Sequence, residues 1–208
     1  MSYVAVIDYG VGNLYSLSSS LKYLGIDSVV TREPEVIKKA GKIILPGVGA
    51  FGDAMEKLRS TGLIPVIYDE IDRGTPLMGI CLGMQMLLKK SYEYGEHEGL
   101  GLINGSVRPM APDLKDMGLS YKVPHMGWNA LEIAKPDCPV LKYTGDGEHM
   151  YFVHSYYGCD CQDSTAAWAD YGVKVPAVVF RENVFGCQFH PEKSGRAGLD
   201  ILKAFSEL

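Results

Sequence analysis

The chain has 208 residues, of which 47% are hydrophobic and 22% are charged, as in an ordinary folded protein. This composition excludes a mainly disordered chain, a collagen-like chain and a coiled coil. The 20 Lys and Arg residues against 25 Asp and Glu residues give a net charge of −5. We therefore expect no nucleic-acid partner, because a broad nucleic-acid surface needs a basic stripe.

The first half of the chain alternates short apolar runs with helical patterns. Strands are expected at residues 3–8, 28–31, 42–45 and 77–80. Helices are expected at residues 14–24, from 33–34 onward, and at 53–59, 63–73 and 82–90. Alternation of this kind predicts a parallel sheet with helices on both faces.

The second half of the chain changes to short strands separated by Gly and Pro turns. They are expected at residues 128–133, 150–157, 166–169, 177–181 and 185–189. The polar segment 92–99 predicts a surface loop, and 194–208 predicts a terminal helix. We expect one α/β domain with a mixed sheet.

The N-terminal residues and the cysteines indicate a cytoplasmic protein. No basic region precedes the first apolar run, so we expect no signal peptide, and the longest apolar stretch, 76–88, is too short to span a membrane. The odd count of five cysteines does not suggest a disulfide scaffold. Cys159 and Cys161 are closer in sequence than zinc ligands usually are, and no second Cys/His pair fits, so we expect no metal site.

The sequence Gly-Ile-Cys-Leu-Gly at 79–83 predicts a nucleophile elbow centred on Cys81. It lies between a predicted strand and a predicted helix, which is the context that such a turn needs. The flanking glycines leave room for the turn, and free N–H groups at the helix N-terminus favour a thiolate. An isolated cysteine is more often a buried structural residue, but these neighbours favour a nucleophile.

His190, Pro191 and Glu192 follow the predicted strand 185–189. A cysteine nucleophile needs a base, and the base needs a group that orients it. Because Pro191 biases His190 toward an extended conformation, we expect His190 and Glu192 to point the same way and to hydrogen-bond. The second ring nitrogen would then face the sulfur of Cys81.

A glycine-rich loop at 46–52 follows the third predicted strand. Backbone N–H groups in such a loop can stabilise a developing negative charge, and the N–H of Leu82 is a further candidate donor. The loop lacks the Gly-Lys-Ser/Thr ending of a P-loop. The glycines at 10 and 12 lack the third glycine of a dinucleotide site, so both kinds of nucleotide site are disfavoured.

The elbow at 81–85, Cys-Leu-Gly-Met-Gln, together with His-Pro-Glu at 190–192, resembles the class I (triad) glutamine amidotransferase family. Within it, three further segments are similar to the glutaminase subunits of imidazole glycerol phosphate synthases: 7–14, 124–129 and 152–157. The resemblance covers essentially the whole chain. It implies a single amidotransferase domain over residues 1–208, with a three-layer, flavodoxin-like fold and a mixed, mostly parallel central sheet.

The resemblance also implies the reaction, in which glutamine gives glutamate and ammonia through a thioester, without a cofactor. Cys81 would attack the amide carbon, His190 would transfer the proton, and Glu192 would orient His190. An oxyanion strand is implied at Val48 and Gly49, and in this family it is expected to need a flip to become productive, so the free subunit is expected to be a poor glutaminase. Substrate contacts are implied from Gly47, Gln85, His154, Ser155 and Tyr156.

A partner protein is implied as well. The ammonia would pass to a separate cyclase subunit with a (β/α)₈ barrel, in histidine biosynthesis. Lys193, directly after Glu192, is a candidate residue of that interface. We expect no membrane partner.

Three alternative functions are open at this point. The chain could be the glutaminase of pyridoxal phosphate or anthranilate synthesis, although the sequences at 8–10 and 126–129 argue against both. It could be a stand-alone cysteine hydrolase acting on γ-glutamyl peptides, which would be fully active without a partner. It could also be a flavodoxin-like binding module that keeps Cys81 for redox sensing and forms no acyl-enzyme.

Overall fold

The main sheet is built from strands of both halves of the chain. Its members are β1 (Val4–Ile7), β2 (Ser28–Thr31), β3 (Lys42–Gly47), β4 (Leu77–Cys81), β8 (His125–Ile133), β9 (His149–His154), β11 (Thr165–Asp170), β12 (Lys174–Arg181) and β13 (Val184–Cys187). They lie in the order β2-β1-β3-β4-β13-β12-β11-β8-β9. The computed structural model describes residues 3–208. The expectation about a signal peptide falls partly on residues 1–2, outside the described residues.

This sheet has a parallel part and an antiparallel part. The strands from β2 to β13 pair in parallel, and those from β13 to β9 pair antiparallel. In the pairing of β4 with β13, Ile80 lies opposite Cys187. Cys81 and the residues that follow Cys187 therefore leave the sheet at the same end, that of the strands' C-terminal residues.

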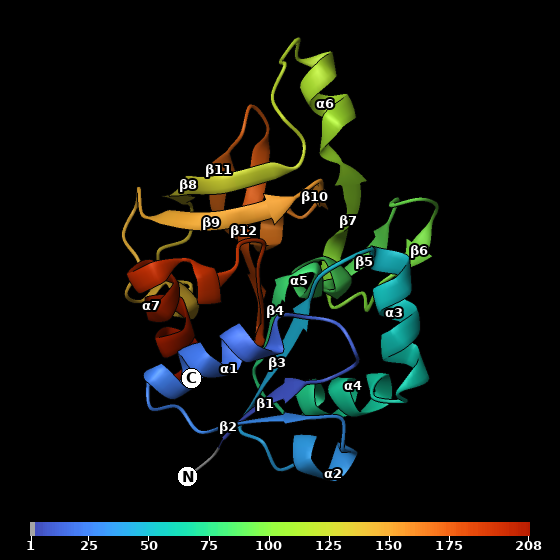
Figure 1. The fold of residues 1–208 in the computed structure, drawn as a ribbon, viewed down its shortest axis with the longest axis vertical. Helices are drawn as coiled ribbons and strands as arrows, with labels where there is room; N and C mark the ends of the chain where they lie inside the picture. The colour runs from blue at the N-terminus through green and yellow to red at the C-terminus, as the bar shows by residue number, and fades with distance from the viewer. Residues whose placement is uncertain (1–2) are drawn as a thin grey trace.

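Helices cover both faces of the sheet (Figure 1). They are α1 (Leu14–Tyr23), α2 (Pro34–Ile37), α3 (Phe51–Ser60), α4 (Ile64–Asp72), α5 (Leu82–Leu87), α6 (Met110–Asp116) and α7 (Gly195–Ser206). Alternate residues of β1 face opposite sides: Val4 and Val6 pack in one core with α1 and α7, and Ala5 and Ile7 in another with α3, α4 and α5. The predicted α/β fold with a mixed sheet between helical layers is confirmed.

A second, four-stranded sheet was not predicted. It contains β5 (Leu88–Ser91), β6 (His97–Glu98), β7 (Ile103–Pro109) and β10 (Tyr156–Cys159), in the order β10-β7-β5-β6. The predicted helix 82–90 was wrong in its second half, because α5 ends at Leu87 and the chain turns extended at Leu88 to pair with β7. Buried backbone pairing with a distant strand here outweighs local helical pattern.

Three other predictions differ from the structure. The expected strand 150–157 is two strands, because β9 ends at His154 and β10 starts at Tyr156 in the other sheet. Helix α6 was not expected. The segment 92–99 includes β6, and its residue Glu93 is buried rather than on the surface. Within residues 3–208, no helix is long and apolar enough to span a membrane.

Glycines allow α5 to pack directly on the strands beneath it. A Cβ on Gly83 would lie 1.9 Å from the carbonyl oxygen of Leu45, and one on Gly79 would lie 2.6 Å from that of Gly83. These distances leave no space for a side chain. The backbone of α5 therefore lies against β3 and β4, and its first turn starts at the end of β4.

Candidate active site

Cys81 joins β4 to α5 in a strained turn. Its backbone angles are φ 54° and ψ −110°, a conformation that L residues rarely adopt. The turn places the sulfur at the end of a buried strand and at the start of a helix. This is the predicted elbow geometry. Cys81 packs against one of the two cores and keeps a small exposed surface.

His190 and Glu192 lie beside the elbow and contact each other. The ring Nδ1 of His190 is 2.8 Å from Oε1 of Glu192, and both side chains are only 3% exposed. The prediction of extended backbone from His190 to Glu192 was wrong. His190 itself is extended, but Pro191–Lys193 form a 3₁₀ turn, η3. This turn brings the Glu192 carboxylate back toward the ring.

The charge state of His190 is set by its neighbours. Burial disfavours the imidazolium, but hydrogen bonds to Cys81 and Glu192 outweigh it and raise the pKa of His190 to about 9. Because Nδ1 faces Glu192, Nε2 is the ring nitrogen left for the sulfur. Cys81 is far in the sequence from His190 and Glu192, but the three lie together at one place, where His190 and Glu192 are hydrogen-bonded.

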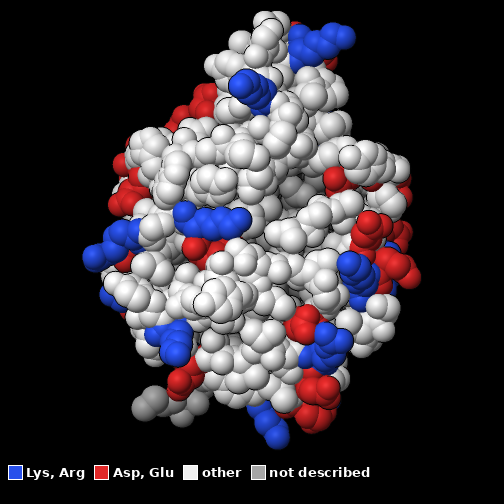
Figure 2. Space-filling model, viewed as in Figure 1, with Lys and Arg blue, Asp and Glu red and all other residues white. Residues whose placement is uncertain are grey.

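A cavity of about 470 Å³ opens above the sulfur. Its lining includes most of the predicted site residues: Val48, Gly49, Cys81, Leu82, Gln85, His154, Ser155, Tyr156, His190 and Lys193. Gly47 is not in the lining, since it packs behind it against Leu82 and Gly83. Glu192 lies behind His190. Figure 2 shows acidic and basic side chains interspersed on one face of the molecule, with no broad field of one sign.

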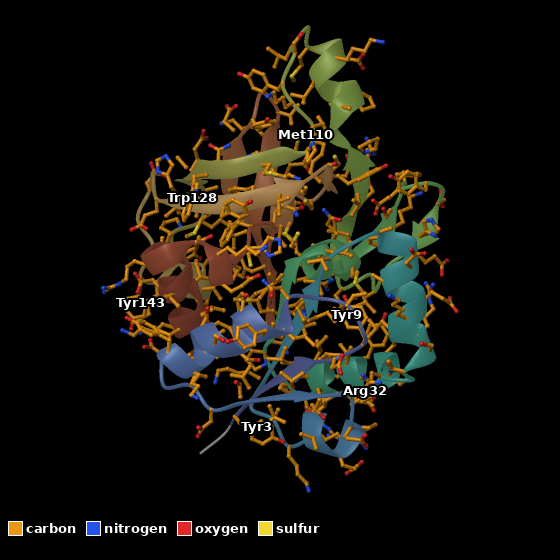
Figure 3. All side chains as sticks on the ribbon, in the orientation of Figure 1. Tyr3, Tyr9, Arg32, Met110, Trp128 and Tyr143 are labelled. Atoms are coloured by element: carbon orange, nitrogen blue, oxygen red, sulfur yellow. The ribbon has the colours of Figure 1, made fainter. Side chains whose placement is uncertain are left out.

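The loop that follows β3 forms one wall of the cavity. Val48 is 41% exposed and Gly49 has a φ of +96°, in the region that favours glycine. The segment before it is fixed, because the buried hydroxyl of Tyr9 donates to the Pro46 carbonyl at 2.7 Å. Burial raises the pKa of Tyr9, which keeps this donor protonated. Tyr9 lies in the middle of the molecule (Figure 3).

Comparison with known proteins identifies this arrangement. The family model described as "Glutamine amidotransferase class-I" matches residues 5–207. The chain belongs to the class I glutamine amidotransferase family. Proteins named imidazole glycerol phosphate synthase subunit HisH are similar to it: that of Bacillus subtilis (strain 168) is 50% identical, covering 99% of this chain and 96% of the relative. That of Lactococcus lactis subsp. lactis (strain IL1403) is 47% identical, covering 100% and 99%.

Solved structures agree on the fold. A crystal structure of a glutamine amidotransferase superposes with a TM-score of 0.74 at 21% identity, covering 100% of both chains. The structure of PurLQS from Thermotoga maritima has a TM-score of 0.74 at 20% identity, covering 99% of this chain and 98% of that one. At such identities the likeness shows the shared amidotransferase fold.

Sequence reasoning missed a buried acid in this amidotransferase. Glu93 is 9% exposed and is the one acidic side chain among the cavity-lining residues in the described part of the chain. Its Oε2 accepts the backbone N–H of Phe51 at 2.6 Å, at the start of α3. Burial raises the pKa of Glu93, so a cation beside it would favour its charged form. The polar sequence around it gave no signal, since only β5 and β6 bring it to the cavity.

A buried histidine pair supports the opposite wall of the amidotransferase cavity. Nδ1 of His125 is 3.0 Å from Nε2 of His154, and Nδ1 of His154 is 2.9 Å from the Tyr156 carbonyl. Burial lowers the pKa of His125 to about 4 and that of His154 to about 3. Both rings are therefore neutral at neutral pH. No group of three His, Cys, Asp or Glu residues suited to a metal occurs within residues 3–208, and all five cysteines are free thiols.

The pairing of His190 with Glu192 makes a testable prediction. Replacing Glu192 with Gln removes a carboxylate, so the pKa of His190 should fall from about 9 toward 6.5 by about one pH unit or more. NMR titration of the His190 ring measures this change. Glu56→Gln, at an exposed position of α3, is the control and should leave the titration unchanged.

The same variant changes the pH dependence of stability. The folded pKa of His190 lies above its ordinary 6.5. Its contribution to the free energy of unfolding is therefore complete below pH 6.5 and is lost as the pH rises through about 9. Glu192→Gln should lose less stability over this interval than the wild type, by denaturant titration. Equal losses, with an unchanged ring titration, would contradict the assigned ion pair.

Proposed function

We propose that the chain is the glutaminase subunit of an imidazole glycerol phosphate synthase and that Cys81, His190 and Glu192 are its catalytic triad. The observation that carries the assignment of residues is the hydrogen-bonded pair of His190 and Glu192 at the same cavity as Cys81. The relatives at 47–50% identity over nearly the whole chain favour this synthase over pyridoxal phosphate or anthranilate synthesis. We also propose that residues 1–208 form one domain and that the protein is cytoplasmic.

The geometry supports a thioester mechanism. The Cys81 thiolate attacks the side-chain amide carbon of glutamine, and the His190 imidazolium gives its Nε2 proton to the leaving nitrogen, which departs as ammonia. Glu192 holds Nδ1 and stabilises the charged ring. Neutral His190 then takes a proton from water, which attacks the thioester carbon and releases glutamate.

Backbone groups on two sides of the sulfur would stabilise the tetrahedral intermediate. The N–H of Leu82 comes directly after the nucleophile at the start of α5. Val48 and Gly49 lie on the same cavity, and Gly49, with its φ of +96°, has the conformational freedom that a rotation of the peptide between them would need. Tyr9 holds the preceding carbonyl, so that a rotation would be confined to the segment after β3.

The far end of the cavity is suited to the amino-acid head group of glutamine. The carboxylate of Glu93 is complementary to an α-ammonium group. Gln85 uses its amide nitrogen for the Tyr156 carbonyl at 2.9 Å, which leaves its oxygen as a second acceptor. Ser155 and Tyr156 line the same region and can present backbone N–H groups to the α-carboxylate.

A partner surface lies beside the cavity. Met126 and Trp128 of β8 are 61% and 56% exposed, which is unusual for large apolar side chains. Trp128, placed on β8 in Figure 3, packs edge-on against Tyr151, and the Nζ of Lys193 lies 6.0 Å from the same ring. This cluster is suited to the cyclase subunit, a (β/α)₈ barrel that receives ammonia from the cavity.

Ammonia release from glutamine tests this function directly. We expect slow release by the protein alone and a strong increase when the cyclase and its nucleotide ligand are added. Cys81→Ala should lower the stimulated rate by about 10³-fold or more, because no other group can form the thioester. Coupled glutamate dehydrogenase measures the rate.

The control is Cys159→Ala, which changes a half-buried thiol of β10 and should keep the stimulated rate. Full activity without any partner would instead indicate a stand-alone γ-glutamyl hydrolase. Capture of another synthase, with no response to the cyclase, would also contradict the proposal.

Glu93→Gln tests the head-group site. Losing the carboxylate should raise the KM for glutamine by about 10-fold or more, with a much smaller change in kcat, because the α-ammonium is bound in ground and transition states alike. Steady-state kinetics with saturating cyclase measure both constants. Glu96→Gln, at an exposed position of the same loop, is the control. A drop in kcat with an unchanged KM would contradict this role.

A further inference from the structure

Gln188 is a buried polar residue that the mechanism above does not use. It follows β13 and its side chain is 0% exposed. Both ends of its amide have partners: Oε1 accepts Nε2 of Gln85 at 3.0 Å, and Nε2 lies 3.8 Å from the sulfur of Cys81. An N–H donor this close to the sulfur can change the reactivity of the sulfur through a hydrogen bond, and an apolar residue of the same size cannot.

The orientation of the Gln188 amide is fixed through Gln85 by a backbone carbonyl, that of Tyr156, which is two hydrogen bonds away. The Tyr156 carbonyl can only accept, so the atom of Gln85 that faces it at 2.9 Å is the nitrogen. The same nitrogen gives its second hydrogen to Gln188. Gln188 therefore presents its oxygen to Gln85 and its nitrogen to Cys81. The opposite rotamer of either amide would place two acceptors, or two donors, together.

The buried histidines hold the carbonyl at the far end of this chain. Nδ1 of His154 donates to Tyr156, so its Nε2 accepts from Nδ1 of His125. His125 stacks between the rings of Phe152 and Tyr171, at centroid distances of 4.9 and 4.0 Å. Since both histidines are neutral at neutral pH, this direction of hydrogen bonding does not change there.

We propose that Gln188 is a further catalytic residue, whose amide N–H hydrogen-bonds to the Cys81 sulfur and stabilises its thiolate form. The assignment rests on the proposed glutaminase function for its role in turnover, but the contact with the sulfur is independent of it. Gln85 and the Tyr156 carbonyl orient Gln188. The wall that would bind the head group of glutamine is thereby connected to the nucleophile through three consecutive hydrogen-bonded groups.

Few other titratable groups face the sulfur. His190 lies beside it, with Glu192 behind the ring, and the Val153 carbonyl is 4.0 Å from the sulfur. Tyr9 and Cys187 also lie near Cys81, but burial raises the pKa of both, so they stay protonated near neutral pH. A change in the thiolate population of Cys81 on replacing Gln188 would therefore report the lost N–H donor. A merely structural role for Gln188 would not produce that change.

The test is the pH profile of Cys81 alkylation by iodoacetamide in the full-length protein, with the adduct quantified by peptide mass spectrometry. The other cysteines interfere little between pH 6 and 8. Burial raises the pKa of Cys138 and Cys159 to about 11 and raises those of Cys161 and Cys187 as well. Only thiolates react at an appreciable rate.

Gln188→Met keeps the size of the side chain and removes the donor. We expect its Cys81 profile to move to higher pH and its alkylation at pH 7 to be about 10-fold slower. Gln188→Leu is the second variant, which also removes the donor and adds no charge beside the sulfur, and it should shift the profile in the same direction. Gln162→Met, an exposed glutamine in the 3₁₀ turn η2 (Gln162–Ser164), is the matched control and should react as the wild type does.

Folding of each variant is checked by near-UV circular dichroism. A wild-type profile in a folded Gln188 variant would overturn the proposal, and if Gln188→Met does not fold, Gln188→Leu decides alone. Alkylation does not require glutamine, so the two proposals fail separately. A shifted profile in a protein that releases no ammonia from glutamine would leave the contact with Cys81 supported and the glutaminase function rejected.

Discussion

The catalytic site depends on the parallel pairing of β4 with β13. The pairing of Ile80 with Cys187 sets the register, so that the elbow and the segment from Gln188 to Glu192 leave the sheet side by side. A slip of one residue would turn every side chain of the shifted strand to the other face of the sheet. The pairing joins residues more than one hundred positions apart in the chain, and both strands are buried on both faces. The rigidity of the core thus fixes the distance between the proposed nucleophile and the proposed base.

The site combines largely buried charges and dipoles. His190 and Glu192 are almost fully buried, where an unpaired charge would be costly, and their mutual hydrogen bond offsets this cost. Gln188 and Gln85 add oriented dipoles on the other side of the sulfur. Because these groups are already ordered before substrate binds, little reorganisation is needed when negative charge develops.

The parts of the structure that the sequence predicted are those with short-range signatures. Cys81 was identifiable because glycines flank it between a strand and a helix, and His190 because Glu192 lies two residues away. The reason expected for that contact was incomplete, since a 3₁₀ turn rather than extended backbone closes it. The second sheet was missed because Leu88 pairs with a distant strand, and nothing local distinguishes its pattern from a helix.

The missed site residues have a common feature. Glu93, Gln188 and Tyr9 are placed by tertiary contacts with helices α3 and α5 and strand β3, which are distant from them in the sequence. None has a spacing that marks it as functional. Their roles follow only from what they face: a cavity, a sulfur atom and a carbonyl next to the oxyanion strand.

The most direct test of the account is labelling with a glutamine-like diazoketone. The protein binds the amino-acid head group of this reagent, which then reacts with the neighbouring nucleophile. The account predicts a single adduct on Cys81, protection by glutamine, and a large loss of labelling in His190→Asn. Labelling at another residue, or undiminished labelling of Cys81 in His190→Asn, would contradict the claim that these two side chains act together.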